Sequence, residues 1–142
     1  MAVLGDPHPF AADALDVDPA ALVAAVGRAV EDQVVRQLRK RGVVVGLSGG
    51  VDSSVVAALC VEALGRERVF GLFMPERDSA SDSLELGRRQ AALLGIDTCL
   101  EPIGDTLEAI GCYRRQDEAI RTVFPAYGPG YKSKITMPSV VD

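Results

Sequence analysis

The chain has 142 residues, of which 48% are hydrophobic and 25% are charged, and its formal net charge is −5. This length is typical of about one domain, and the composition is that of a globular protein. The acidic balance argues against a nucleic-acid-binding protein, and no apolar stretch is long enough for a membrane span.

The chain begins with residues that predict an arm and then a helix. Residues 1–17 carry acids and prolines, and we interpret them as an arm in front of a domain that covers residues 18–142. Asp18 before Pro19 is typical of a helix start, because the carboxylate accepts from free N–H groups and proline fits the first helical position. Gly42 ends this helix. Apolar residues recur every four positions and predict one buried stripe, formed by Leu22, Val26, Val30, Val34 and Leu38.

Strands and helices then alternate. Residues 43–45 predict a strand buried on both faces, and "SVVAALCVEAL" predicts a helix that Gly65 closes. "RVFGLFMP" and "IDTCLEPI" predict two more strands, and the helix "SLELGRRQAALLG" lies between them, with Asp82 and Glu85 as a capping-box-like start. Residues 105–124 predict one or two helices broken near Gly111. This order favours an α/β fold, in which a parallel sheet carries helices on both faces.

The last stretch, "PAYGPGYKSKITMPSVVD", differs from the alternating region before it. Its prolines and glycines predict a loop, and residues 133–137 predict an edge strand. Three or four strands are few for a sheet of this kind, so we expect the domain to be incomplete and to belong to a longer protein.

The cysteines and the histidine give little indication of a disulfide framework or a metal site. The three cysteines are widely spaced, and the single histidine is His8, so a disulfide framework and a zinc site are both disfavoured. We interpret the cysteines as packing residues of a protein in a reduced compartment, and we expect the cytoplasm.

The segment "VVVGLSGGVDSSV" places a glycine-rich loop between a predicted strand and a helix. Such a loop presents backbone N–H groups at the positive end of a helix dipole, which favours a bound phosphate. It lacks the lysine of the P-loop and the glycine spacing of the dinucleotide fingerprint. Asp52 either holds magnesium beside bound phosphates or only satisfies the helix dipole, and its position leaves both interpretations open.

The string "SGGVDSS" in this context resembles the PP-loop of the ATP pyrophosphatases, a superfamily that includes NAD synthase, GMP synthase, asparagine synthase and tRNA-modifying enzymes. The resemblance implies an adenine-nucleotide α-hydrolase-like (Rossmann-like) fold and cleavage of ATP between its α and β phosphates. It implies magnesium on Asp52 and no side chain that acts as a covalent catalyst. The ATP-binding residues that it implies in the loop are Gly46, Leu47, Ser48, Gly49, Gly50, Val51, Asp52 and Ser53.

The stretch "GLFMPERDSASDSLELGRRQAALLGID" is similar to the pattern of NAD synthase, and adds Met74 and Arg77 to the implied ATP-binding residues. Arg77 is either an ATP contact or a solvated loop residue. The resemblance covers residues 19–135 and only the front half of the family's synthetase domain.

By this resemblance, the protein is a ligase that joins ammonia to the nicotinate carboxylate of deamido-NAD through an adenylated intermediate. ATP and Mg²⁺ are the implied cofactors. Ammonia would come free or from a glutaminase partner, and a homodimer is the implied assembly. Two alternatives stay open: another adenylating enzyme of the superfamily, similar to GMP synthase or acting on tRNA, and a nucleotide-binding fragment without turnover.

Overall fold

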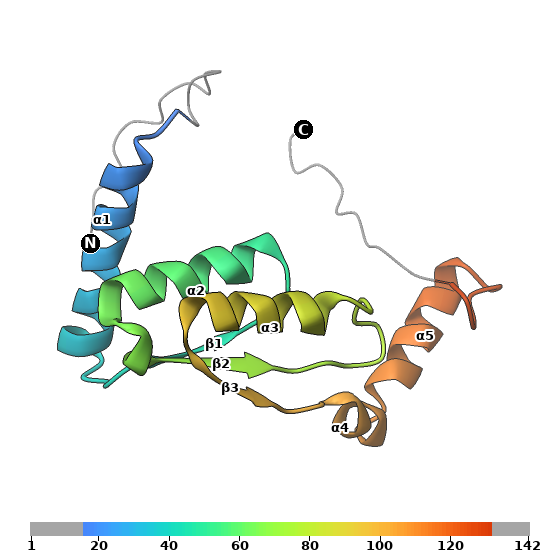
Figure 1. Cartoon of the computed structure of the whole chain (residues 1–142). Helices are drawn as coiled ribbons and strands as arrows, with labels where there is room; N and C mark the ends of the chain where they lie inside the picture. The colour runs from blue at the N-terminus through green and yellow to red at the C-terminus, as the bar shows by residue number, and fades with distance from the viewer. Residues whose placement is uncertain (1–15, 132–142) are drawn as a thin grey trace. The chain divides into compact units, whose positions relative to one another are not determined.

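The computed structural model describes residues 16–131, which divide into two compact units (Figure 1). Unit 1 consists of residues 16–74 and Ala80–Leu100, and unit 2 consists of Pro75–Ser79 and residues 101–131. The arm predicted for residues 1–17 lies almost entirely outside the described residues, and so does the edge strand predicted at residues 133–137. The boundary predicted at residue 18 stays a prediction.

Unit 1 is built on a three-stranded parallel sheet in the order β1-β2-β3. The strands are β1 (Val43–Gly46), β2 (Val69–Phe73) and β3 (Asp97–Leu100). The first two are rich in β-branched and aromatic residues, which favour strands. The predicted α/β fold with a parallel sheet is therefore confirmed.

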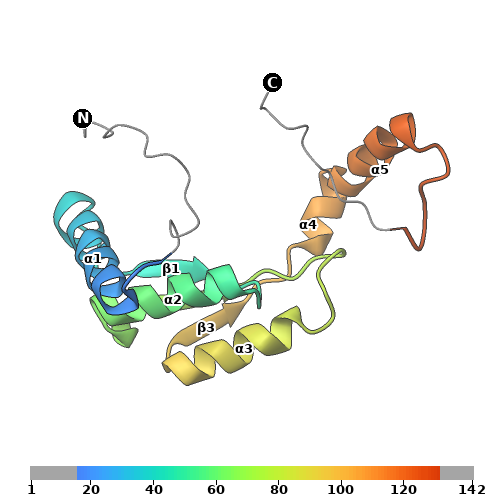
Figure 2. The ribbon, with the colours of Figure 1, turned by 90° about the horizontal axis from the view of Figure 1, so that it is seen from above.

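Two helices of unit 1, α2 (Val51–Leu64) and α3 (Ser83–Leu94), lie on the same side of the three strands (Figures 1 and 2). This arrangement follows from two successive right-handed crossovers that move in one direction across the sheet. A single turn of 3₁₀ helix, η2 (Arg66–Arg68), joins α2 to β2. The core between sheet and helices consists of Val45, Leu47, Ala57, Cys60, Val69, Phe73, Ala91 and Ile96.

The opposite face of the sheet differs from the prediction for the first strand. Val44 was expected to be buried, but 66% of it is exposed, and Phe70 beside it is 38% exposed. The reason is that α2 and α3 both cover the other face, and no described helix of unit 1 covers this one. The predicted burial of the first strand on both faces is therefore wrong for the described part of the chain.

The N-terminal helix α1 (Pro19–Glu31) begins as predicted, because the Asp18 carboxylate accepts from the N–H groups of Ala20 (3.0 Å) and Ala21 (3.3 Å). It continues into a wide π-helical turn, η1 (Asp32–Gln37). The chain leaves the helix at Arg39, which has a φ of 53°.

The predicted apolar stripe of α1 is only partly buried. Val34 is buried, and Val26 and Val30 are half-buried. Leu22 and Leu38 are 49% and 63% exposed, so their predicted burial is wrong. At the C-terminal end of the stripe, the wide turn of η1 and the left-handed residue after Leu38 explain why Leu38 points away from the packed face.

Unit 2 contains two short helices, α4 (Gly104–Ala109) and α5 (Cys112–Val123). The predicted break near Gly111 is confirmed, since this glycine has a φ of 70° between the two helices. Across residues 16–131, every helix is too short or too polar to span a bilayer.

Candidate functional site

The glycine-rich loop joins the end of β1 to the start of α2. Leu47 is only 6% exposed, and its N–H donates to the Leu72 carbonyl at 2.9 Å, which extends the pairing of β1 with β2 by one residue. The chain then leaves the sheet, and Gly50 is the N-cap residue of α2. Only three residues, all of them small, therefore separate the end of the pairing between β1 and β2 from the first residue of α2.

Serine hydroxyls fold this loop onto itself. The Ser53 hydroxyl accepts from the Ser48 N–H at 3.2 Å and donates to the Gly50 carbonyl at 3.1 Å. The Ser48 hydroxyl lies 3.1 Å from the Ser53 hydroxyl and accepts from the Gly50 N–H at 3.3 Å. Ser54 also donates to the Gly50 carbonyl, at 2.9 Å. These bonds fix the loop without any charged side chain.

Gly49 is required by the backbone and by its surroundings. Its φ is 77°, a conformation that side chains with a Cβ rarely adopt. A Cβ at this position would lie 2.3 Å from the Ser83 carbonyl oxygen at the start of α3. The loop therefore passes against the next helix of unit 1 with no room for a side chain.

The start of α2 leaves its N–H groups open to a ligand. No side chain caps this helix, so the N–H groups of its first turn, at Val51, Asp52 and Ser53, lack the partner that a capping side chain would give. The positive end of the helix dipole lies at the same place. This geometry fits a phosphate, and among residues 16–131 no carboxylate or hydroxyl caps the helix in that role.

Asp52 lies in the first turn of α2 and is exposed to solvent. A carboxylate oxygen is a ligand that Mg²⁺ prefers, and it lies next to the open N–H groups. Within residues 16–131, no group of three or more potential ligands converges on one point. A metal at this place would therefore depend on the phosphates of the ligand for most of its coordination.

Met74 follows β2 and reaches the same end of the sheet. Its Cε lies 3.4 Å from the position that a Cβ of Gly46 would take, so the two predicted residues face one another across neighbouring strands. The structure thus brings Met74 together with the end of β1. The exposed fraction of Met74 is 45%, which leaves its side chain available to a ligand.

Arg77 lies in unit 2, where other side chains hold its guanidinium. It forms ion pairs with Asp78 (3.3 Å) and Asp117 (3.5 Å), and its Cζ lies 4.1 Å from the centre of the Tyr113 ring. The hydrogen bonds that Arg77 donates to the Asp78 carboxylate are the main cause that raises the pKa of Arg77 above its ordinary value. The Arg77 side chain is 41% exposed and paired with two carboxylates, and its predicted contact with ATP stays a prediction.

Tyr113 is the residue that sequence reasoning missed. It is 5% exposed, and its hydroxyl accepts from the Arg77 N–H at 3.2 Å and donates to the Glu76 carboxylate at 3.1 Å. Burial raises the pKa of its phenol. No local pattern could have paired Tyr113 with Arg77, because 36 residues separate them.

The capping box predicted at the start of α3 is not formed. Asp82 is the N-cap residue, but its side chain makes no capping hydrogen bond, and its backbone is already helical, with φ −97° and ψ −10°. An N-cap carboxylate reaches the N–H groups of the first turn from an extended backbone, which explains the difference.

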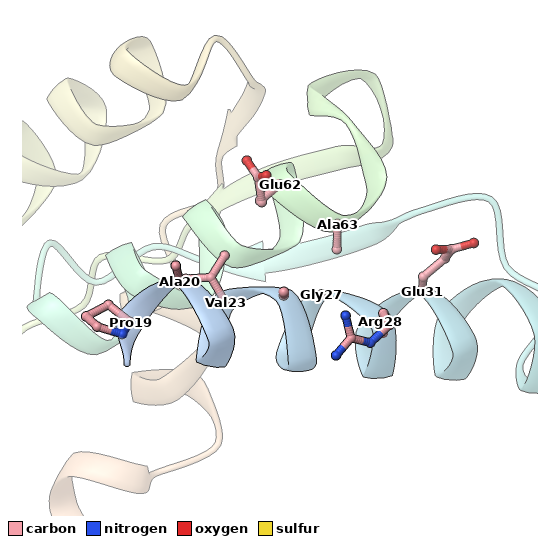
Figure 3. A pocket seen from close by; sticks show the side chains of 9 residues that line it. Pro19, Ala20, Val23, Gly27, Arg28, Glu31, Glu62 and Ala63 are labelled. Carbon is pink, nitrogen blue, oxygen red and sulfur yellow. The ribbon is translucent and has the colours of Figure 1, made fainter. Parts of the chain in front are cut away.

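Another cavity lies away from these residues. It has a volume of about 640 Å³ and lies between α1 and α2, where Gly27 faces Ala63 (Figure 3). Its walls include Val23, Arg28 and Glu62. None of the predicted ATP-binding residues lines it, and the glycine-rich loop remains the better candidate because its N–H groups converge at one helix start.

The chain matches the family model described as NAD synthase over residues 22–124, more than half of its length. It is 58% identical over 128 residues to the NH(3)-dependent NAD(+) synthetase of Mesorhizobium japonicum, a match that covers 90% of this chain and 40% of that protein. The chain thus spans about two fifths of the length of this relative.

Two solved structures are similar. The NH3-dependent NAD synthetase of Campylobacter jejuni, in complex with nitrate, has a TM-score of 0.63 and 30% identity, over 77% of this chain and 50% of that one. The glutamine-dependent NAD+ synthetase of Acinetobacter baumannii, in complex with ADP, has a TM-score of 0.62 and 27% identity, over 77% of this chain and 19% of that one.

Proposed function

This chain belongs to the NAD synthase family, and we propose that it forms the ATP-binding part of an ammonia-dependent NAD synthase. The reaction is the ATP-dependent amidation of deamido-NAD to NAD. Because the chain spans about 40% of the Mesorhizobium relative, the complete reaction needs residues beyond those that match it.

The observation that carries the proposal is the uncapped start of α2 behind the self-bonded loop at residues 48–53. Open N–H groups at a helix start stabilise a phosphate, and loop hydroxyls that are bonded to one another leave the backbone already arranged before a ligand arrives. Gly49 and Gly50 allow the pyrophosphate of ATP to approach the backbone closely.

The proposed chemistry divides into two steps. The nicotinate carboxylate oxygen attacks the α phosphorus of ATP, the bond from that phosphorus to the bridging oxygen breaks, and pyrophosphate leaves. Ammonia then attacks the acyl-adenylate, and AMP leaves as the amide forms and a proton is lost. The N–H groups at the start of α2 would stabilise the charge that develops on the leaving pyrophosphate.

Asp52 is the residue that would hold Mg²⁺ in this site. When it is bound, the ion would neutralise phosphate charge and orient the pyrophosphate. Asp52 is the only carboxylate within the loop and the first turn of α2, so its role can be tested alone.

The test is isothermal titration of the purified chain with Mg²⁺ and an ATP analogue in which a methylene replaces the oxygen between the α and β phosphorus atoms. This analogue binds but cannot release pyrophosphate. We expect binding that depends on Mg²⁺ and that falls at least about tenfold in Asp52→Ala, because a bridging ion and its ligand contribute more than about 1.4 kcal/mol. Affinity that is equal in the variant would contradict the role of Asp52.

A matched control is Asp105→Ala. Asp105 is also an exposed aspartate in the first turn of a helix, α4, but it belongs to unit 2 and is not part of the glycine-rich loop. Its removal should leave the affinity for the analogue unchanged. The Arg77 side chain, which Asp78 and Asp117 already hold, is tested in the same series by Arg77→Lys.

A second candidate function is the adenylation of a different acceptor. A panel of carboxylates, xanthosine monophosphate and tRNA, assayed with the chain and the rest of a synthetase, would distinguish the two by which acceptor releases pyrophosphate. A glutaminase partner, a homodimer and a cytoplasmic location belong to the same proposal, as they accompany an ammonia-dependent synthase.

A further inference from the structure

Tyr113 holds both the backbone and the side chain of Arg77. Among the described residues of unit 2, Tyr113 alone is buried, with 5% of it exposed. Its hydroxyl accepts from the Arg77 N–H at 3.2 Å, and the Arg77 Cζ lies 4.1 Å from the centre of its ring. The side chain that is best buried in this part of the chain thus fixes the loop that carries Arg77.

Glu76 fixes the same loop through its carboxylate. One oxygen accepts from the Tyr113 hydroxyl at 3.1 Å, and the other accepts from the Asp78 N–H at 2.9 Å. The Glu76 N–H in turn donates to the Ser79 hydroxyl at 3.0 Å. Because these bonds hold the loop backbone, the loop can keep its shape when the guanidinium of Arg77 changes its partner.

Asp117 holds Arg77 in a weaker way. It lies one helical turn after Tyr113 on α5, on the same face of that helix. One of its oxygens lies 3.5 Å from Arg77 Nη2, and the other lies 3.7 Å from Arg121 Nη2. Both arginine side chains are partly exposed, at 41% and 44%, and ion pairs of this kind contribute little. An anion from solution can therefore replace Asp117.

A cavity in unit 2 gives an anion access to these groups. It has a volume of about 400 Å³, and its walls include Arg77, Asp117, Arg121 and Tyr127. The carboxylate of Asp117 pairs with both arginines. A phosphate group that enters the cavity meets both cations, but the negative charge of Asp117 repels it and competes for the same N–H groups.

We infer that Tyr113 positions Arg77 for a phosphate group of the bound nucleotide, and that Asp117 is the internal competitor that this phosphate displaces. The inference rests on the proposed function, because that function supplies the nucleotide. Tyr113 keeps the loop ordered, so binding does not have to order it. Asp117 occupies the guanidinium until the phosphate arrives, so it lowers the affinity. The two residues thus act on the affinity in opposite directions.

Titration of the full chain with Mg²⁺ and the methylene analogue of ATP tests these opposite effects. Tyr113→Phe keeps the ring but loses both hydroxyl bonds, and it should weaken binding at least about threefold. Asp117→Asn keeps the shape but loses the charge, and it should tighten binding at least about threefold. A residue that only stabilised unit 2 would not tighten binding when it is changed. Any result other than these two opposite changes would overturn the inference.

Two matched controls lie on the same helix. Glu118→Gln changes the net charge as Asp117→Asn does, but Glu118 pairs with Arg114. Thr122→Val removes a hydroxyl that donates to the Ala119 carbonyl at 2.7 Å. Both controls should keep the affinity within about twofold of the wild type. If Glu118→Gln tightens binding as much as Asp117→Asn, the gain is a general effect of charge and the inference fails.

A second background shows whether the gain depends on Arg77. In the Arg77→Gln protein, Asp117→Asn should change the affinity less than about twofold, because Arg77 is the cation through which the gain acts. A gain that persists there would overturn the inference. Failure of the proposed function gives different results. A wild type that does not bind the analogue contradicts both. Unchanged affinity in Asp52→Ala contradicts the role of the glycine-rich loop alone, and leaves the opposite effects of Tyr113 and Asp117 in place.

Discussion

Two loops follow neighbouring strands of this chain, and they are organised in opposite ways. The loop after β1 is held by serine hydroxyls and backbone groups that lie within six residues of one another. The segment after β2, which carries Arg77, is held by Tyr113 and Asp117 from a helix far along the chain. The first loop leaves the N–H groups at the start of α2 without a capping side chain, whereas the cation of the second, Arg77, pairs with carboxylates of the protein.

The comparison shows what kind of site each loop can form. Backbone groups around a glycine turn keep their positions without a partner, so the β1–α2 loop would receive the proposed anion without rearranging. The guanidinium of Arg77 is already paired with two carboxylates, so it can contact a phosphate only by exchanging one partner for another. The following substitutions test this contrast, from the largest effect to the smallest.

Gly49→Ala should have the largest effect. The positive φ and the approach to the Ser83 carbonyl both oppose a Cβ, so we expect a loss of about 3 kcal/mol in the free energy of unfolding and loss of ATP binding. Urea denaturation and titration with the ATP analogue measure the two effects. Gly128→Ala is the control, because a Cβ there meets nothing within 4 Å. A Gly49→Ala protein as stable as this control would refute the account of the loop.

Tyr113→Phe should loosen the second loop and leave the first unchanged. The change removes both the acceptor of the Arg77 N–H and the donor to Glu76. We expect the Arg77 amide to exchange its hydrogen faster, on the order of tenfold, with no change at residues 48–53. Tyr127→Phe is the matched control, since no hydrogen bond to the Tyr127 hydroxyl is found between residues 16 and 131.

The same tyrosine predicts a dependence on pH. Burial raises its pKa, so the folded state favours the neutral phenol. Its contribution to stability should be complete below the ordinary value of about 10 and should fall as the pH rises through the higher folded value. In thermal melts from neutral to strongly alkaline pH, the melting temperature of the wild type should approach that of Tyr113→Phe. A constant difference between the two proteins would contradict this assignment.

Asp117→Asn should have the smallest effect. It weakens the ion pairs with Arg77 (3.5 Å) and Arg121 (3.7 Å), and ion pairs that stay partly exposed contribute little. We expect the melting temperature to fall by no more than a few degrees, and the difference to shrink in high salt. Glu118→Gln breaks an exposed pair with Arg114 on the same helix and should change the stability less. An effect of Asp117→Asn as large as that of Gly49→Ala would reverse the ranking of the two loops.

The sequence predicted the features that depend on neighbours along the chain. The parallel α/β order follows from alternating strand and helix patterns, and the cap of α1 follows from Asp18 and Pro19. The glycine-rich loop is local, so its place between β1 and α2 was also predicted. Its roles in binding ATP and Mg²⁺ stay predictions.

The sequence could not predict what depends on residues far apart. The exposure of Val44 depends on which face of the sheet α2 and α3 cover. Three valines in a row do not indicate which face that is. The surroundings of Arg77 depend on Tyr113 and Asp117, which lie 36 and 40 residues further on. The failed cap at Asp82 depends on the backbone conformation at that residue, which its side chain type does not fix.

The distance along the chain between Arg77 and Asp117 also sets an order of events during synthesis. The hydroxyl bonds of the first loop can form once Ser54 has left the ribosome. The ion pair between Arg77 and Asp117 can form only after Asp117 has been synthesised. Asp117 follows 40 residues later, which takes roughly 2–8 s at ordinary rates of translation. During that interval the serine bonds of the glycine-rich loop can already be in place, while Arg77 has only its neighbour Asp78 as a partner.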